Sequence, residues 1–299
     1  MRWPDAGGKA LADSLASLAL AAASSLAVIA LAVIVYTLIA ESMPFLREAG
    51  LEFLLGSRWE VLFGRPEYGV LPLVAGTMMV AVIAIVVAGV MGVGVAVYLS
   101  EYAPHRVRSV LKPVMEVLAG IPTVVYGYFA LYYITPVLDR LVGVDVHNAL
   151  SAGIAVGLMI TPIVASISED ALYRVPEGLR MAAYALGASK SQVITRVVLR
   201  AALPGIVAAY IVGFARAVGE TMIVAIAAGF RPVLTLDPRV SVQTMTGYIA
   251  QVATGDAPRG TLEYYSLFAV GLLLLVMVFA FNLAGLAIAR RYALRLRVL

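Results

Sequence analysis

Long runs of apolar residues, separated by short polar segments, make up most of the chain. Six runs approach or exceed the roughly 20 residues that a helix needs to cross the hydrocarbon core of a bilayer: residues 15–39, 71–99, 114–138, 149–167, 203–229 and 264–289. Within these runs the apolar residues do not alternate with polar ones, as the strands of a membrane β-barrel require. The pattern therefore predicts an all-α integral membrane protein with about six transmembrane helices.

Several runs carry residues that disfavour a straight helix. The first run is longer than the apolar region of a cleaved signal peptide, about 7–15 residues, so we expect a retained helix. The third run contains Gly120 and Pro122, which predict a bent or broken span. Pro162 lies inside the fourth run and favours a kink there. The spans are therefore expected to differ in regularity, with the third the most disturbed.

The composition agrees with a lipid environment. Hydrophobic residues make up 62% of the chain and charged residues 13%, about half of the roughly 25% charge of soluble domains. The chain has no cysteine, which excludes disulfides, thiol catalysis and cysteine metal sites. The two histidines, His105 and His147, lie in loops predicted on opposite sides of the membrane. No metal site, cofactor or nucleic-acid partner is therefore expected.

The basic residues are divided unequally between the two sides of the predicted membrane. With six spans, both termini share one side, and that side holds 14 of the 22 Lys and Arg residues, against 7 on the other side. Cytoplasmic loops carry the excess of Lys and Arg in membrane proteins. The bias predicts a multi-pass protein of the cell membrane with both termini in the cytoplasm.

Three longer segments connect the spans. Residues 41–70 lie outside and contain five aromatic residues, which favours either an amphipathic interfacial segment or a small cap. Residues 169–202 lie inside and have a helix-forming composition, and residues 230–263 lie outside. We expect an N-terminal helix with its external segment (residues 1–70), a transport domain (71–290) with a coupling loop (169–202), and a basic tail (291–299).

The inner loop contains a short motif. Residues 181–190 read MAAYALGASK, and residues 197–199 read VVL. This resembles the EAA loop of ATP-binding-cassette (ABC) importer permeases: Glu-Ala-Ala, three residues, Gly, nine residues, Ile-x-Leu-Pro. Met181 replaces the usual Glu, Val197 the Ile and Arg200 the Pro. The positions that match are Ala182, Ala183, Gly187 and Leu199.

The residues of this loop indicate a compact helical knob. A short helix, a glycine turn and a second helix would project into the cytoplasm, and small residues such as Ala182 would let another protein approach closely. The basic residues Arg180, Lys190 and Arg196 could pair with acidic groups of that protein. In the family, such a loop docks on the ATPase subunit. A plain amphipathic hairpin on the inner leaflet is the alternative.

The remaining resemblance covers about residues 71–290. Residues 98–104 (YLSEYAP), 118–127 (LAGIPTVVYG) and 216–222 (RAVGETM) resemble the phosphate-specific branch of these permeases, of the PstC type. The resemblance implies a type I importer permease fold, a homologous partner permease of the PstA type, an ATPase dimer and an extracytoplasmic phosphate-binding protein. Residues 187–191 do not match a phosphate-binding loop, which needs a Gly directly before the Lys, where Ser189 stands. The chain is thus expected to be a transport subunit without enzymatic activity of its own.

Two charges fall inside the fifth span. Arg216 lies 13 residues from either end of the run, and Glu220 follows four residues later on the same helical face. Gly213 shares that face, so another helix can come close. Ionisable residues inside a membrane usually mark a substrate path, and guanidinium suits the bidentate recognition of phosphate. A buried ion pair that only fixes helix packing is the alternative.

The predicted pathway includes residues near both irregular spans. Thr123 and Tyr126 follow the break at Pro122, where a half-helix would present free amides to an anion, unless Pro122 is only a packing kink. Thr221 follows Glu220 within the signature of the fifth span. The predicted substrate pathway therefore comprises Arg216, Glu220, Thr221, Thr123 and Tyr126.

Three other functions remain open from the residues alone. A permease for molybdate, tungstate or sulfate would share every feature of composition. A secondary transporter or channel would work without an ATPase, and a membrane scaffold would have no path at all. Only the resemblance of the second, third and fifth spans favours phosphate.

Overall fold

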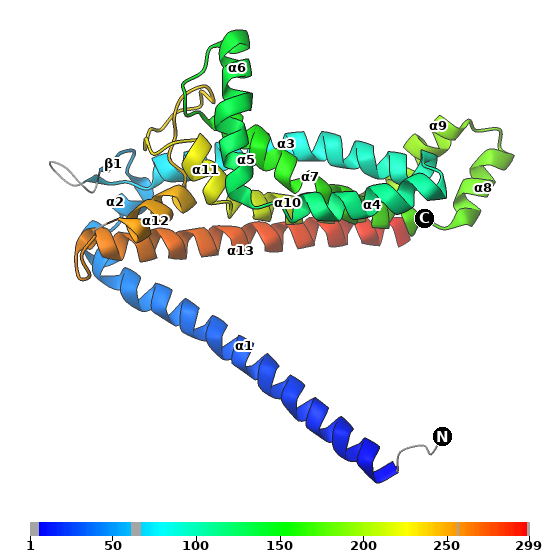
Figure 1. Ribbon diagram of the computed structural model, residues 1–299, viewed down its shortest axis with the longest axis horizontal. Helices are drawn as coiled ribbons and strands as arrows, with labels where there is room; N and C mark the ends of the chain where they lie inside the picture. Colours follow the sequence, from blue (N-terminus) through cyan, green and yellow to red (C-terminus); the bar gives the residue numbers. More distant parts are fainter. Residues whose placement is uncertain (1–5, 61–66, 256, 298–299) are drawn as a thin grey trace.

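The computed structural model describes residues 6–60, 67–255 and 257–297 and consists almost entirely of helices (Figure 1). Five of the described helical segments are long and apolar enough to cross a membrane, and a sixth span results if one bent pair of helices is counted. Their helices are α1 (Ala6–Ala49), α3 (Leu71–Val97), the bent pair starting with α4 (His105–Ala119), α7 (Ala149–Tyr173), α10 (Leu199–Val218) and α13 (Leu262–Arg297). The predicted set of six runs is thus confirmed, with changed boundaries.

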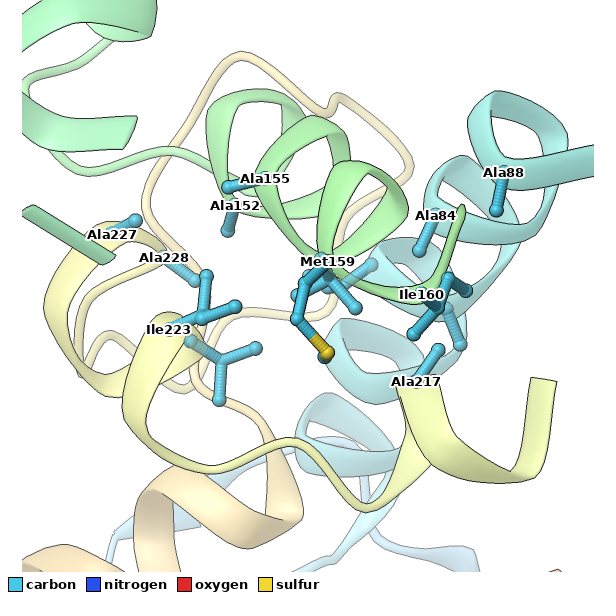
Figure 2. Close-up of a cluster of buried hydrophobic side chains, with 14 of the residues drawn as sticks. Ala84, Ala88, Ala152, Ala155, Met159, Ile160, Ala217, Ile223, Ala227 and Ala228 are labelled. Atoms are coloured by element: carbon cyan, nitrogen blue, oxygen red, sulfur yellow. The ribbon is translucent and has the colours of Figure 1, made fainter. Parts of the chain in front are cut away.

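The bundle packs closely because its interior is lined by small residues. Helices α3, α7 and α10 lie side by side, with α13 along α10 (Figure 1). A Cβ atom at Gly213 of α10 would lie 2.8 Å from Val164 Cγ2 of α7, so only glycine permits this approach. Figure 2 shows the core, which includes Ala84, Ala88, Ala152, Ala155, Met159, Ile160, Ala217, Ile223, Ala227 and Ala228.

The third span is broken, as predicted. Helix α4 ends at Ala119, and after residues 120–122 the chain continues as α5 (Thr123–Phe129), the π-helical turn η2 (Ala130–Ile134) and α6 (Thr135–Val142). The two halves are bent by 87°. Pro122 has an extended ψ of 132° and precedes the first residue of α5, a position where its missing N–H costs nothing.

The described parts of residues 41–70 form a small cap rather than an interfacial helix. The C-terminal part of α1, the short helix α2 (Glu52–Leu55) and a two-stranded hairpin of β1 (Trp59–Glu60) and β2 (Glu67–Tyr68) surround an aromatic cluster. Phe45 is fully buried there, and the Trp59 ring packs edge-on against Tyr248 at 5.0 Å. Tyr248 belongs to α12 (Met245–Thr254), a helix within residues 230–263. Helix α1 contacts α13, and its N-terminal part extends away from the bundle (Figure 1).

The inner loop forms the predicted knob at the opposite end of the bundle, beside the end of α13 (Figure 1). It comprises α8 (Glu177–Ala185), a turn at Gly187, α9 (Lys190–Val193) and the π-helical turn η3 (Ile194–Val198), which leads into α10. Gly187 has a φ of +81°, which L residues with a side chain rarely adopt. A further π-helical turn, η1 (Tyr98–Tyr102), ends α3 at the same level of the bundle.

Candidate functional site

The fifth span is interrupted at its two charged residues. Helix α10 ends at Val218, and the short helix α11 (Met222–Ala227) starts after residues 219–221. The expectation of one continuous helix over residues 203–229 is wrong because Gly219 disfavours helix and Glu220 turns its carboxylate to the start of α11. Arg216 therefore lies in the last turn of α10 and not in the middle of a regular helix.

Glu220 is held at this break by several donors. Its side chain is only 3% exposed, and its carboxylate accepts hydrogen bonds from Arg216 Nη1 at 2.8 Å and from the backbone N–H groups of Met222 and Ile223 at 3.2 and 3.3 Å. Its carbonyl accepts a hydrogen bond from Thr246 Oγ1 at 2.6 Å. A carboxylate at a helix N-terminus and a guanidinium at a helix C-terminus both complement the helix dipoles. The break thus fixes the negative charge firmly.

Arg216 is held less completely than its partner. Its side chain is 41% exposed, and Glu220 is its only hydrogen-bond partner among the described residues. A guanidinium carries five N–H donors, so most of its donors have no protein partner within the described residues. The predicted i,i+4 pair is confirmed, and one member of that pair can still receive an anion.

The second break lies next to α11. The Tyr126 hydroxyl donates a hydrogen bond to the carbonyl of Leu118 at 3.2 Å, which joins α5 to the end of α4 across the bend. Helix α5 packs on α11, where a Cβ atom at Gly127 would lie 3.0 Å from Ile226 Cδ1. Two interrupted helices therefore meet here, as in transporter sites built from discontinuous spans.

The predicted pathway residues do not form one contact cluster. Thr123 begins α5 and is half-buried, and Thr221 is half-buried at the second break. Across the described ranges, no hydrogen bond links Arg216 or Thr221 to Thr123 or Tyr126. The structure brings together Arg216 and Glu220, with Thr221 next to them at the break, and it places Thr123 and Tyr126 on α5, which packs on α11.

The outer surface of the knob is apolar. Leu179, Met181, Tyr184 and Leu186 are exposed, and Leu186 is 89% exposed. Ala182 is also exposed, whereas Ala183 packs inward on the cluster under the knob. Such a protruding apolar surface on a short helical hairpin is suited to contact with another protein.

The basic residues of the knob do not all face outward. Arg196 is exposed, as expected for a contact with an acidic partner. Arg180 instead turns inward and pairs with Glu101 at 2.9 Å, with its side chain 14% exposed. Lys190 lies over the ring of Tyr102, 4.4 Å from its centroid. The expectation that Arg180 pairs with a partner protein is therefore wrong, because its guanidinium is used within the chain.

A second ion network at the same end was not predicted. Glu169 of α7 is 1% exposed and pairs with Arg108 and, at 2.9 Å, with Lys112, which also reaches Asp170 at 3.1 Å. Glu116 lines an open cavity of about 300 Å³ between α4 and α7. The sequence did carry a signal for this network. Arg108 and Lys112 lie four residues apart on the amphipathic α4, and Glu169 and Asp170 lie near the end of the apolar α7.

Solved structures with the same fold define the class of protein. The chain aligns with a permease chain of the MetNI methionine ABC transporter (TM-score 0.55, 24% identity, 74% of this chain and 95% of that chain). It also aligns with a chain of a bacterial ABC transporter for the import of alginate (TM-score 0.57, 15% identity, 89% and 95%). The fold is that of a type I ABC importer permease.

The sequence comparisons give the family. Residues 88–297 match the family described as "Binding-protein-dependent transport system inner membrane component". The chain therefore belongs to this family and is a transport permease subunit of a cell membrane. Membership implies two kinds of partner, an ATPase and a substrate-binding protein.

Named relatives cover most of the chain. The probable ABC transporter permease protein YqgH of Bacillus subtilis is 37% identical over 78% of this chain and 75% of the relative. The phosphate transport system permease proteins PstC of Mesorhizobium japonicum (31% identical, 96% of this chain and 91% of the relative) and Xylella fastidiosa (32%, 97% and 94%) match nearly end to end.

Proposed function

We propose that the chain is the PstC-type permease subunit of an ATP-driven importer for inorganic phosphate. The observation that carries the proposal is the identity of 31–32% to phosphate permeases over 96–97% of the chain. In this function residues 71–290 form the transport domain, preceded by an N-terminal helix with the external cap in residues 1–70 and followed by a basic tail in residues 291–299.

Arg216 is the residue that meets the anion in this proposal. A partly exposed guanidinium inside a lipid-embedded bundle must face protein or water rather than acyl chains. Its planar fork matches two phosphate oxygens and keeps its charge at every physiological pH. Thr221 at the same break, and Thr123 and Tyr126 at the start of α5, line the path with hydroxyl groups in this proposal.

Glu220 sets how strongly the anion is held. The carboxylate stays fixed by the N-terminus of α11 and shares the guanidinium with the passing anion. An arginine without this carboxylate would bind phosphate more tightly and release it more slowly. A transporter needs release as much as capture, so the pair suits a transient site.

The knob is the docking element for the ATPase in this proposal. Its exposed apolar surface around Met181 and Leu186, the exposed Ala182 and the Gly187 turn support insertion into a groove of that subunit, with Lys190 and Arg196 at its rim. A homologous PstA-type permease completes the path, and a phosphate-binding protein delivers the anion from outside.

The proposed orientation places both termini in the cytoplasm. The knob and the end of α13 lie at the same end of the bundle, which is the end with the excess of basic residues (Figure 1). The cap and α12 then lie on the outer side, where the binding protein arrives.

Uptake of labelled phosphate in a strain that lacks the gene tests the proposal. Restored uptake that is insensitive to excess molybdate, tungstate or sulfate supports phosphate, and competition by one of these anions would reassign the substrate. Uptake that persists after ATP depletion, with the ion gradient kept, would indicate a secondary transporter. Purification of the tagged chain in detergent should also recover an ATPase and a second permease.

A further inference from the structure

Both helices of the coupling knob are attached to the same short turn. Glu101 and Tyr102 are adjacent residues of η1, the π-helical turn that ends α3. Glu101 pairs with Arg180 of α8, and Tyr102 lies under the ammonium group of Lys190 of α9. One turn of the membrane bundle thus holds the two arms of the knob.

Arg180 is the more extensively bonded of the two basic residues. Its Nη2 donates to Glu101 Oε1 at 2.9 Å and to the carbonyl of Leu172 at 3.0 Å, and its Nη1 donates to the carbonyl of Val175 at 2.9 Å. Leu172 lies in the last turn of α7. A single guanidinium therefore joins α8 to the ends of both α3 and α7, through charge-assisted bonds that are among the stronger ones in proteins.

The second acceptor on the same arginine provides an internal comparison. Glu177 Oε2 lies 3.3 Å from Arg180 Nη1, but its side chain is 73% exposed and belongs to α8 itself. Glu101 is 10% exposed and belongs to another element. Surface ion pairs contribute little, so the contact with Glu101 carries the link between knob and bundle.

Lys190 adds a weaker contact at the second arm. It is the first residue of α9, which is fixed by the capping box of Ser189 and Gln192. Its Nζ lies 4.4 Å from the centroid of the Tyr102 ring, and cation–π contacts at exposed sites are weak. Arg180 and Lys190 together attach the knob on both sides of its Gly187 turn.

Apolar contacts seat the knob on the same elements. A buried cluster joins the end of α3 to the end of α7, to the knob and to α10; its members include Ala96, Leu172, Val175, Val193, Val198 and Ala202. Such a packed base does not deform gradually. A displacement of the knob is therefore passed on to three spans, and the polar contacts to η1 determine how fully α3 follows.

The π-helical form of η1 suits a joint. The N–H of Ala103 bonds to the carbonyl of Tyr98 at 2.8 Å, five residues back, where an α-helix would use Leu99. Single π turns are rare and occur frequently at functional sites.

We propose that the Arg180–Glu101 pair, assisted by Lys190 on Tyr102, is the joint through which movement of the knob reaches α3 and opens or closes the path. The proposal rests on the proposed function, because it assumes that the knob docks on an ATPase. Arg180 and Glu101 are positioning residues in this mechanism and touch neither phosphate nor ATP.

The test measures ATP hydrolysed per anion imported, using the whole complex in proteoliposomes with its binding protein. Glu101→Gln and Arg180→Gln should each raise this ratio at least about fivefold, the lower end of typical coupling between sites. The double variant should match the single ones because both remove one joint, and the exchange of Glu101→Arg with Arg180→Glu should restore part of the coupling. Glu177→Gln is the matched control and should behave as wild type.

The proposal is overturned if the assembled single variants keep the wild-type ratio of ATP hydrolysed per anion imported, or if their effects add in the double variant. Where a single variant does not assemble, the cysteine-free sequence provides a second test. The double variant Glu101→Cys with Arg180→Cys, once bridged by a thiol-specific cross-linker, should hydrolyse about as much ATP per imported anion as wild type. The unbridged double variant should hydrolyse more, and equal ratios in the two forms would overturn the proposal. If the wild-type complex imports another oxyanion, the phosphate assignment fails, and the ratio is measured with that anion.

Discussion

Two arginine–glutamate pairs lie at two different levels of the bundle and are built in opposite ways. Arg216 and Glu220 are four residues apart, at the break between α10 and α11. Arg180 and Glu101 are 79 residues apart and join the knob to η1. The Arg216 side chain is 41% exposed, whereas that of Arg180 is 14% exposed.

The difference indicates two uses for one kind of contact. In the first pair the carboxylate is fixed by backbone donors, and the guanidinium keeps most of its donors available for a ligand. In the second pair both terminal nitrogens of the guanidinium are engaged with protein acceptors. In the proposed mechanism, a pair within one segment presents a charge, and a pair between segments transmits position.

Removal of Arg216 should have the largest effect on transport. Arg216→Met should lower phosphate uptake by about tenfold to a hundredfold, because hydrogen bonds to a charged group contribute about 1.5–3 kcal/mol. Uptake of labelled phosphate by the complex, with assembly followed by co-purification, measures this. Unchanged uptake would remove the reason for placing the anion at this residue.

Two further variants separate transport from folding. Arg216→Met leaves the buried carboxylate of Glu220 without its partner, which itself destabilises the protein. The double variant Arg216→Met with Glu220→Gln removes that charge, so assembly should recover while uptake stays low. Arg216→Lys keeps the charge but loses the fork and should give intermediate uptake.

Neutralisation of Glu220 should have a smaller effect of a different kind. Glu220→Gln keeps an acceptor for the N–H groups of Met222 and Ile223 but frees Arg216 to hold the anion. We expect the KM for uptake and the maximal rate both to fall, by about threefold to tenfold, because the altered contact is worth about 1 kcal/mol. Initial rates over a range of phosphate concentrations test this, with the exposed Glu48→Gln as the control. A raised KM with an unchanged rate would contradict the role given to Glu220.

The Gly187 turn tests the outer face of the knob separately from its joint. Gly187→Ala should weaken ATPase binding about fivefold to thirtyfold, since a left-handed residue with a Cβ costs roughly 1–2 kcal/mol. A Cβ atom there meets nothing within 4 Å, so the effect is one of backbone conformation alone. Titration of the complex with the ATPase subunit measures the affinity.

Two controls keep that result specific. Gly178 lies in α8 with a helical backbone and open space around it, and Gly178→Ala should leave binding unchanged. Gly187→Asn should lie between glycine and alanine because Asn tolerates left-handed conformations better. Equal behaviour of the alanine variants at positions 178 and 187 would show that the turn does not shape the docking surface.

Features that depend on neighbouring residues were predictable from the sequence. The break at Pro122 follows from ring geometry, the knob from a helix-forming stretch around Gly187, and the contact of Arg216 with Glu220 from helical spacing. Each of these features is determined by a few residues that are close together in the sequence. The spans were found because lipid demands long uniform runs.

Features that depend on distant residues were not predictable. The sequence does not show whether the Arg180 side chain faces a partner protein or Glu101. Its orientation depends on how the ends of α3 and α7 lie beside α8. The pairing of Lys112 with Glu169 likewise depends on the packing of α4 on α7. The break after Val218 was missed because the six apolar residues of α11 restore the hydropathy of α10 after only three intervening residues.

A third arginine–carboxylate pair extends the comparison to the surface. Asp237 accepts bonds from Arg239 Nε and Nη2 at 2.9 and 2.8 Å in the outer loop, two residues away. The Arg239 side chain hydrogen-bonds this carboxylate and lowers the pKa of Asp237 to about 2. Since this pKa is depressed, any stability from the pair is present above about 3.8, the ordinary value, and is lost as pH falls toward 2.

Asp237→Asn should accordingly have the smallest effect of the substitutions on named charge pairs. An exposed pair is screened by water and salt and contributes little, so uptake and the Tm at pH 7 should stay close to wild type. The Tm difference between wild type and variant should also stay constant from pH 7 to pH 5, because the carboxylate remains ionised throughout. A difference that grows in this range would mean that the carboxylate takes up a proton there, and that burial or a neighbouring group outweighs Arg239.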